Sequence, residues 1–210
     1  MLRAFDWQAI QSRATFAGDD WVSNKLKHWL PILDPMRAKP LTILEIGSYE
    51  GRSALFFLSY FPHANISCID PFFGGRETIF DKNLAPYADR LTKIRDFSLP
   101  ALIKLRQTDE EFDLVYIDGN HERESVLMDS VLAWGMLKLN GILIWDDYGG
   151  NYKRNHPNWD HPTSAINGFL VAYANEYREE ARFKQLIVRK TQSTPRCRVR
   201  LSRVSKKFNP

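Results

Sequence analysis

The stretch EIGSYEG at residues 45–51 decides the fold, and it follows a short β-rich run at residues 41–46. Gly47 and Gly51 permit a tight turn and a close approach of other backbone atoms, because glycine carries no Cβ. Residues 52–60 then have a helical composition, and a helix N-terminus presents amides that suit a carboxylate. Two glycines four residues apart also fit a plain strand-to-helix turn, so the position of the stretch must distinguish a ligand loop from a turn.

Strands and helices alternate after this turn. Further β-rich runs are expected at residues 65–70, 91–95, 112–118 and 142–146. Helices are expected at residues 52–60, after Gly75, at 98–106 and at 122–139, the last stopped by Asn140 and Gly141. The run at 142–146 is apolar almost throughout, as a strand covered on both faces should be. The alternation predicts an α/β fold with a doubly wound parallel sheet and helices on both faces.

The first 40 residues are expected to form a helical cap. Asp19 and Asp20 stand where an N-cap would. An apolar stripe of helical period follows, formed by Trp21, Leu26, Trp29 and Leu30. Prolines at positions 31, 35 and 40 are expected to interrupt this helix.

The C-terminal part departs from the alternation. After a helix at 163–177, two β-like runs at 183–188 and 196–204 have little sequence between them, which predicts a terminal antiparallel hairpin. The arginines at 196, 198 and 200 share one face of the second run. We therefore expect a single domain of residues 1–210, with the cap at 1–40, a core at 41–204 and a basic tail at 205–210.

The composition is that of an ordinary globular protein. Of 210 residues, 44% are hydrophobic and 26% are charged. The longest strongly apolar run, at residues 54–61, is too short to span a bilayer, and the N-terminus lacks the apolar core of a signal peptide. Two cysteines, Cys68 and Cys197, make no disulfide framework. We expect a cytoplasmic protein with reduced thiols and no transmembrane segment.

Positive charge is concentrated at the C-terminal end. Residues 178–210 hold 11 Lys and Arg against 2 Asp and Glu, a local charge of +9. The remainder holds 18 basic and 23 acidic residues, a local charge of −5. A basic end can bind nucleic acid or anionic lipid. A solvated strand face with a frayed tail also explains the concentrated positive charge, and this interpretation is preferred.

Polar residues follow the second and third strand runs, at the edge of the sheet where ligands bind in such folds. Asp70 ends the run at 65–70, where a carboxylate can accept both ribose hydroxyls of an adenosine. Asp96, Phe97 and Ser98 follow the run at 91–95 and can supply a polar contact and an apolar wall for adenine. Alternatively, Asp70 is a turn residue before Pro71 and Ser98 is a helix N-cap.

With these motifs the chain resembles class I S-adenosylmethionine-dependent methyltransferases, especially those of the catechol O-methyltransferase type. Residues 44–54 are similar to the family's first motif, and residues 116–121 and 140–148 resemble a bacterial branch whose enzymes modify sugars and antibiotics. The resemblance covers residues 41–177. It implies a Rossmann-like seven-stranded sheet, S-adenosylmethionine as the methyl donor, and a small molecule or sugar as the acceptor.

The same resemblance implies a donor-binding set. Its members are Glu45, Gly47, Ser48, Tyr49, Gly51, Ser53, Asp70, Asp96, Phe97, Ser98 and Asp118. The loop from Gly47 to Ser53 would hold the methionine part of the donor. Proteins that bind NAD usually show a three-glycine turn, whereas Ser48 and Glu50 stand here, and this favours the methyl donor over the dinucleotide.

Three carboxylates are expected to converge at the reaction end. Asp118 ends the run at 112–118, and Asp146 and Asp147 end the next run. Oxygen ligands suit Mg²⁺ or another divalent cation. In the catechol-type family a metal is held by an acid after strand four and an Asp-Asn pair after strand five, which implies Asp118, Asp146 and, in place of the Asn, Asp147. Alternatively, Asp118 and Asp146 line the donor pocket and Asp147 caps the next turn.

His121 follows Asp118 by three residues. In the catechol-type family a lysine at the corresponding offset is the general base, so the resemblance assigns a catalytic role to His121 together with Asp118. His121 can act as this base with a pKa nearer neutrality than that of a lysine. Alternatively, it is a helix-start histidine that only forms hydrogen bonds. The polar stretch at 149–162, with His156, Trp159 and His161, is interpreted as a mobile substrate loop, with a passive surface loop as the alternative.

Several alternatives remain open. One is a metal-independent methyltransferase in which Asp118 or His121 alone is the base. Another is an oxidoreductase or hydroxylase on the same scaffold. A third, of another class, is a non-catalytic nucleic-acid or lipid-binding module that uses Arg196, Arg198, Arg200, Lys206 and Lys207. The Trp-rich N-terminal helix covers either its own domain or that of a partner, and the latter would make a homo-oligomer.

Overall fold

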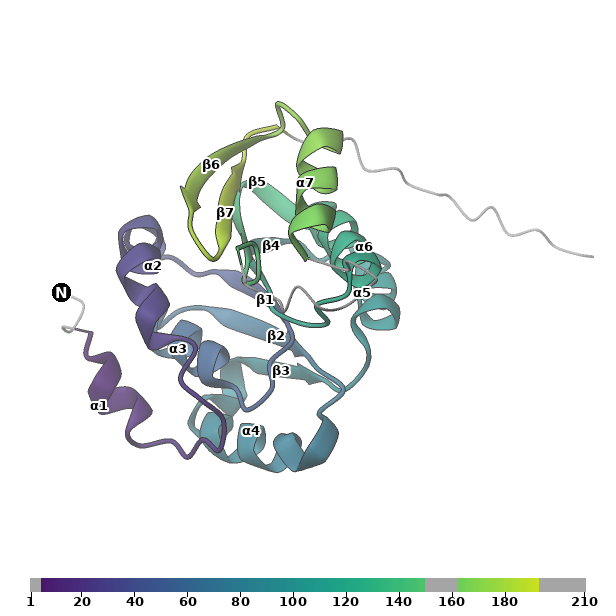
Figure 1. Cartoon of the computed structure of the whole chain (residues 1–210). Coiled ribbons are helices and arrows are strands. Elements are labelled where there is room, and N and C mark those ends of the chain that lie inside the picture. Colours follow the sequence, from purple (N-terminus) through teal and green to yellow (C-terminus); the bar gives the residue numbers. More distant parts are fainter. Residues whose placement is uncertain (1–4, 150–161, 193–210) are drawn as a thin grey trace, which may run out of the picture.

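The structure is a computed structural model that describes residues 5–149 and 162–192. Seven strands form one sheet in the order β3-β2-β1-β4-β5-β7-β6 (Figure 1). The strands are β1 (Thr42–Ile46), β2 (Asn65–Ile69), β3 (Leu91–Ile94), β4 (Phe112–Ile117), β5 (Leu137–Trp145), β6 (Tyr177–Arg182) and β7 (Leu186–Lys190). The first five strands are parallel, and β7 is antiparallel to both β5 and β6. The predicted seven-stranded, doubly wound sheet is confirmed.

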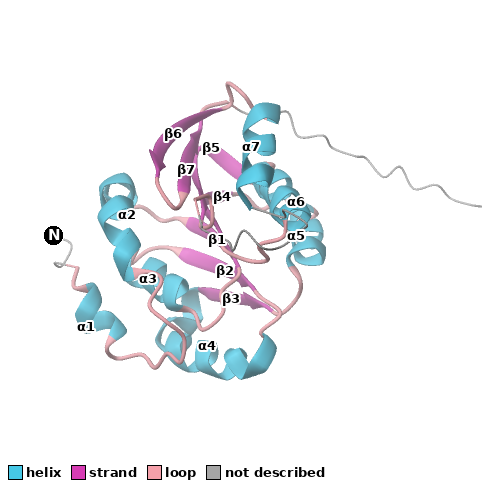
Figure 2. Ribbon diagram, in the orientation of Figure 1, coloured by secondary structure: helices cyan, strands magenta, loops and turns pink. Residues whose placement is uncertain are grey.

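Helices cover both faces of this sheet (Figure 2). They are α1 (Trp7–Gln11), α2 (Leu26–Leu33), α3 (Arg52–Tyr60), α4 (Arg76–Leu84), α5 (Ser98–Arg106), α6 (Arg123–Trp134) and α7 (Pro162–Ala172). Side chains alternate along each strand, so Leu114 and Tyr116 of β4 face the core under α1 to α4, while Val115 and Ile117 face the core under α5 to α7. The runs at 52–60 and 98–106 form helices as predicted.

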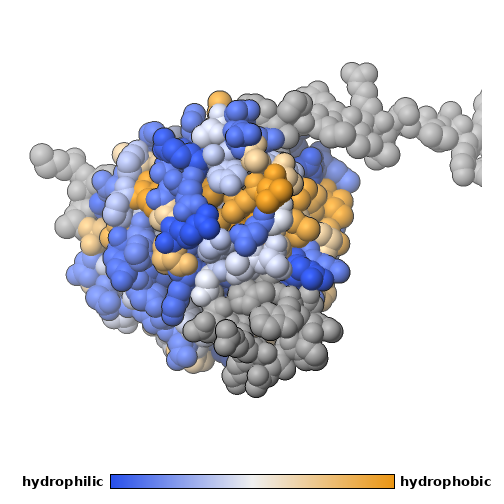
Figure 3. Space-filling model, turned by 45° about the horizontal axis from the view of Figure 1, so that its top comes forward, coloured by the Kyte–Doolittle hydropathy of each residue, from blue (hydrophilic) through white to orange (hydrophobic). Residues whose placement is uncertain are grey.

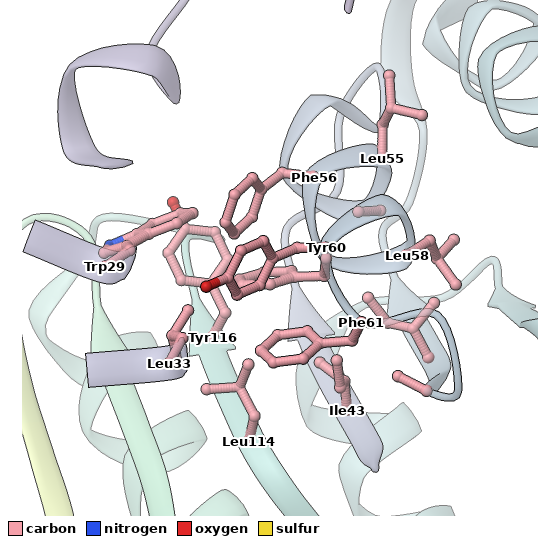
Figure 4. Close-up of a cluster of buried hydrophobic side chains, with 14 of the residues drawn as sticks. Trp29, Leu33, Ile43, Leu55, Phe56, Leu58, Tyr60, Phe61, Leu114 and Tyr116 are labelled. Atoms are coloured by element: carbon pink, nitrogen blue, oxygen red, sulfur yellow. The ribbon is translucent and has the colours of Figure 1, made fainter. Parts of the chain in front are cut away.

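The N-terminal cap packs against the sheet and α3 through aromatic side chains (Figure 4). The indole of Trp29 in α2 lies parallel to the ring of Phe57 at a centroid distance of 5.4 Å and edge-on to Tyr116 at 5.4 Å. Trp29 and Leu33 are fully buried. Helix α2 continues through Pro31, contrary to the predicted interruption. Pro31 is the sixth of the eight helical residues, so the helix lacks the hydrogen bond that an amide at this position would donate.

The predicted helix at 122–139 is too long, because its last residues belong to the start of a strand. Helix α6 ends at Trp134, and β5 already begins at Leu137. The buried ammonium of Lys190 donates to the carbonyls of Trp134 (2.9 Å) and Leu137 (3.0 Å), so a residue distant in sequence satisfies the end of the helix. Asn140, with a φ of 65°, lies inside β5 at an irregularity of the β4–β5 pairing.

The terminal hairpin exists, but other residues form it. Its strands are β6 and β7, whereas the predicted run at 196–204 lies outside the described residues. Helix α7 ends at Ala172 instead of residue 177, because Asn175 adopts a left-handed conformation (φ 72°) that a helix does not accommodate. Strand β6 therefore falls between the predicted helix at 163–177 and the predicted run at 183–188, and the sequence pattern did not identify it.

The molecular surface mixes polar and apolar residues, and one face shows hydrophobic side chains gathered beside charged ones (Figure 3). Within the described ranges, none of the helices combines the length and the apolar character that a bilayer crossing requires.

Candidate active site

The carboxyl ends of β1 and β4 meet at the switch point of the sheet, since the chain passes from β1 outward to β2 and β3 and then returns to β4 on the other side. Gly47 lies at this point with a φ of +87°. A Cβ on Gly47 would stand 2.0 Å from the carbonyl oxygen of Asp118 and 2.6 Å from Cα of Gly119. No other residue type fits there, so the first glycine of the motif lets the β1 turn and the β4 end lie in contact.

The turn continues into α3. Gly51 has a φ of +81°, and a Cβ there would stand 3.0 Å from the ring of Phe80. Ser53 lies buried in the first turn of α3. Because the first-turn amides of a helix have no intrahelical acceptors, the turn at residues 47–53 has the properties of an anion-binding loop.

Asp70 follows β2 and binds the turn. Its Oδ2 accepts from the amides of Ser48 (2.9 Å) and Tyr49 (2.8 Å), and its Oδ1 accepts from the amide of Phe72 (2.6 Å). Tyr49 has a positive φ of 48°, a conformation that these hydrogen bonds help to hold. Asp70 therefore shapes the glycine turn, and its carboxylate keeps some acceptor capacity for a ligand.

Glu45 lies beneath the same turn. Its side chain is fully buried, and Cys68 Sγ donates to its Oε2 across 3.4 Å. Burial raises the pKa of Glu45 to about 7, although the nearby hydroxyls of Ser48 and Ser53 oppose this shift. A buried carboxyl with a pKa near neutrality is typical of a ligand-binding site rather than of a plain turn.

The segment after β3 presents an exposed aromatic pair. The rings of Phe73 and Phe97 lie 5.8 Å apart and are 68% and 61% exposed. Asp96 accepts from Lys104 Nζ (2.8 Å), and this contact lowers the pKa of Asp96. Ser98 is the first residue of α5 and Phe97 takes the N-cap position without a side-chain hydrogen bond, so the alternative of Ser98 as the N-cap is wrong. Two large exposed rings beside polar groups form a surface on which a planar ligand can stack.

The reaction end gathers Asp118, His121 and Asp147. One ligand atom from each lies within 4.8 Å of the others. His121 Nε2 is 2.9 Å from Asp147 Oδ2 and 3.8 Å from Asp118 Oδ1. These residues line a small pocket together with Ile117, Gly119, Asn120, Val126, Trp145, Asp146, Pro162 and Ile166. Two carboxylates and one imidazole at this spacing fit a divalent cation.

The electrostatics of this group differ from the expectation for His121. The nearby carboxylates of Asp118 and Asp147 raise the pKa of His121 to about 10. Burial, together with the charge of Asp146, raises the pKa of Asp118 to about 6. The expectation that the pKa of His121 lies nearer neutrality than that of a lysine is therefore wrong for this arrangement, because two carboxylates stabilise the imidazolium.

Asp146 lies apart from that group and has partners of its own. Its Oδ1 accepts from Lys25 Nζ and from Gln185 Nε2, and it lies 2.7 Å from the hydroxyl of Tyr116. The same hydroxyl is 2.9 Å from Asp118 Oδ2, and it can donate to only one carboxylate at a time. The three predicted carboxylates therefore have different partners: Asp146 forms an ion pair with Lys25, whereas Asp118 and Asp147 lie beside His121.

Sequence reasoning missed four residues near the site. Lys25 and Gln185 reach Asp146 from the cap and the hairpin, and Tyr116 joins Asp146 to Asp118. Glu50 accepts from the amides of Ala17 (2.8 Å) and Gly18 (3.1 Å). Tyr116 alone carried a local signal, since it precedes Asp118 by two residues and so shares a strand face with it. The histidines and tryptophan of the predicted substrate loop, and the basic residues beyond 192, lie outside the described residues.

Comparison with known proteins places the chain in a family. The family described as Methyltransferase domain matches residues 44–148, half of the chain. The chain is 32% identical over 124 residues to the O-methyltransferase hkm8 of Aspergillus hancockii, covering 57% of this chain and 46% of hkm8. The chain spans about half the length of the curated relatives it matches.

Solved structures share the fold. MycE, a methyltransferase from the mycinamycin biosynthetic pathway in complex with Mg and SAH, gives a TM-score of 0.70 at 16% identity over 91% of this chain and 55% of that chain. The O-methyltransferase from Bacillus cereus in complex with SAH gives 0.65 at 18% identity, covering 88% of each. With the matched segment running from β1 to the acids after β5, the chain belongs to the methyltransferase domain family.

Proposed function

We propose that this protein is an S-adenosylmethionine-dependent O-methyltransferase that acts on a hydroxyl of a small molecule or sugar. One observation carries the proposal: the glycine turn after β1 is in backbone contact with the acidic end of β4, so a donor loop and a reaction pocket adjoin. The relative hkm8 is named an O-methyltransferase, and MycE and the Bacillus cereus enzyme bind SAH, the product form of the donor.

In this proposal the donor lies across the switch point. Gly47, Gly51 and Ser53 accommodate the methionine part against the α3 N-terminus, while buried Glu45 faces that region from below. Asp70 accepts the ribose hydroxyls with its remaining acceptor capacity. The adenine stacks beside Phe97, with Asp96 and Ser98 as polar neighbours. Ser48 and Tyr49 form the turn over the methionine part. Asp118 closes the pocket on the acceptor side.

The acceptor hydroxyl occupies the pocket lined by Asp118, His121 and Asp147. Methyl transfer from a sulfonium is a direct displacement, so the main task of the protein is to align the acceptor oxygen. Asp118, with a pKa of about 6, is ionised at neutral pH and can take the hydroxyl proton. The His121 imidazolium donates to the developing oxyanion. A divalent cation held by Asp118, Asp147 and the deprotonated imidazole of His121 would replace the imidazolium as the source of positive charge for that oxygen.

A second candidate is a metal-independent O-methyltransferase. The ion pair between Lys25 and Asp146 favours it, because one of the three expected metal ligands already has a cationic partner. Turnover in the presence of EDTA separates the two candidates, since only the metal-dependent reaction stops.

Donor binding tests the shared part of both candidates. Isothermal titration calorimetry should show SAH binding and no binding of NAD⁺. Transfer of a labelled methyl group from S-adenosylmethionine to a panel of sugar and phenolic hydroxyls then tests the reaction. A protein that binds NAD⁺ and not SAH would contradict the proposal.

A further inference from the structure

A lysine of the N-terminal cap enters the candidate site. Lys25, at the start of α2, forms an ion pair with Asp146, and each side chain is only 12% exposed. Its ammonium also lies 3.4 Å from the hydroxyl of Tyr116. A shielded carboxylate needs a compensating charge, and for Asp146 this charge comes from the chain itself.

A second cap residue supports the same contact. Trp29, four residues after Lys25 and therefore on the same helix face, donates its indole N–H to Gln185 Oε1 across 2.7 Å. The amide nitrogen of Gln185 donates to the same Asp146 oxygen that pairs with Lys25. The cap thus acts on Asp146 directly through Lys25 and indirectly through Trp29 and Gln185.

The formal charges explain why Lys25 matters for a metal. Asp118, Asp146 and Asp147 together carry three negative charges when ionised. Lys25 offsets the charge of Asp146, whereas His121 contacts Asp118 and Asp147. A divalent cation that used all three carboxylates would have to share Asp146 with an ammonium, and two cations on one carboxylate oxygen repel each other.

We propose that Lys25 is an internal cation that competes with a divalent metal for Asp146. With Lys25 in place, a metal is limited to Asp118, His121 and Asp147; without it, Asp146 becomes an additional ligand. Lys25 is in this sense a positioning residue for the metal. Because Lys25 belongs to the N-terminal cap, docking of the cap opposes binding of the metal to Asp146. The inference rests on the proposed function, since it concerns the same pocket.

Binding of Mn²⁺, followed by electron paramagnetic resonance on the metal-free full chain, tests this competition. We expect Lys25→Met to tighten the Mn²⁺ dissociation constant by about tenfold, because affinity rises with the number of charged ligands. Lys25→Arg keeps the positive charge and should stay within about twofold of the wild type. Lys27→Met, an exposed lysine two residues along α2, is the matched control and should leave the constant unchanged.

The double variant Lys25→Met with Asp146→Asn shows whether the gain comes through Asp146, and it should return to the wild-type constant or a weaker one. Lys25→Gln, which keeps a hydrogen-bonding side chain, replaces Lys25→Met if that variant does not fold. The proposal is overturned if neither neutral variant binds Mn²⁺ more tightly than the wild type, including the case in which none binds it, or if the gain persists without Asp146. SAH calorimetry on the same proteins distinguishes this proposal from the proposed function. If the wild type does not bind SAH, the proposed function is contradicted, whatever the Mn²⁺ dissociation constants are.

Discussion

The Cα of Gly47 points a hydrogen at the main chain of Asp118, and a methyl group in its place would stand 2.0 Å from the carbonyl oxygen of Asp118. This relationship joins the first residue of the predicted donor loop to the first residue of the predicted reaction end. A single added Cβ atom at Gly47 would therefore disturb both the donor loop and the reaction end.

Gly47→Ala should therefore destabilise the protein and abolish SAH binding, because the new methyl group must displace backbone and also meets an unfavourable positive φ. We expect a loss on the order of 3 kcal/mol in urea unfolding. Gly168→Ala is the matched control, since that helical glycine has open space around it and alanine there should add up to about 1 kcal/mol. Equal stability of the two variants would refute the close packing at Gly47.

Glu45→Gln should stabilise the ligand-free protein at high pH and weaken donor binding. The pKa of Glu45 is raised to about 7 by burial, so the folded state keeps a proton that the unfolded state loses, and wild-type stability falls as pH rises from about 4.5 to 7. The variant should exceed the wild type by roughly 2 kcal/mol at pH 8, with the difference vanishing below pH ~4.5. Asp19→Asn, which removes an exposed carboxylate, should show no such pH-dependent gain. A variant that unfolds alongside the wild type at every pH would contradict the raised pKa.

His121 should make the stability of the metal-free protein depend on alkaline pH. Because Asp118 and Asp147 raise the pKa of His121 to about 10, its stabilisation is fully present below the unfolded pKa of about 6.5 and is lost as pH rises through about 10. The His121→Ala protein should lack this downward slope between pH 7 and 10 in denaturant titrations with EDTA present. The control is His63→Ala, an exposed histidine outside the site; parallel curves for wild type and His121→Ala would exclude the ion pair.

Glu50→Gln should loosen the N-terminal cap while the sheet stays folded. The buried Glu50 carboxylate accepts from the amides of Ala17 and Gly18 and pairs with Arg76. Loss of its charge weakens all three contacts, so tryptic cleavage within residues 13–27 should become at least severalfold faster. Glu124→Gln, an exposed acid on α6, serves as the control. If cleavage occurs at the wild-type rate, Glu50 does not anchor the cap.

Local sequence pattern predicted most of the parallel core but failed where distant residues decide an element's end. Residues 52–60 and 98–106 form the predicted helices, because their apolar periodicity and flanking residues agree with the fold. The end of α6 was misplaced because Lys190, 56 residues from Trp134 in sequence, satisfies its last carbonyls. The hairpin strand at 177–182 was missed because its alternation is weak and a helix precedes it directly.

By itself, the sequence determined the order of strands and helices, the glycine turn and the position of acids after β4 and β5, since these depend on periodicity and on glycine conformations that are local properties. Only the tertiary structure decided the partners of those acids. It brought Lys25 and Gln185 from opposite ends of the chain to Asp146, and it left Asp118 and Asp147 beside His121. The physical reason is that ion pairs depend on distance in space, and the docking of the cap and hairpin sets that distance after the chain has folded.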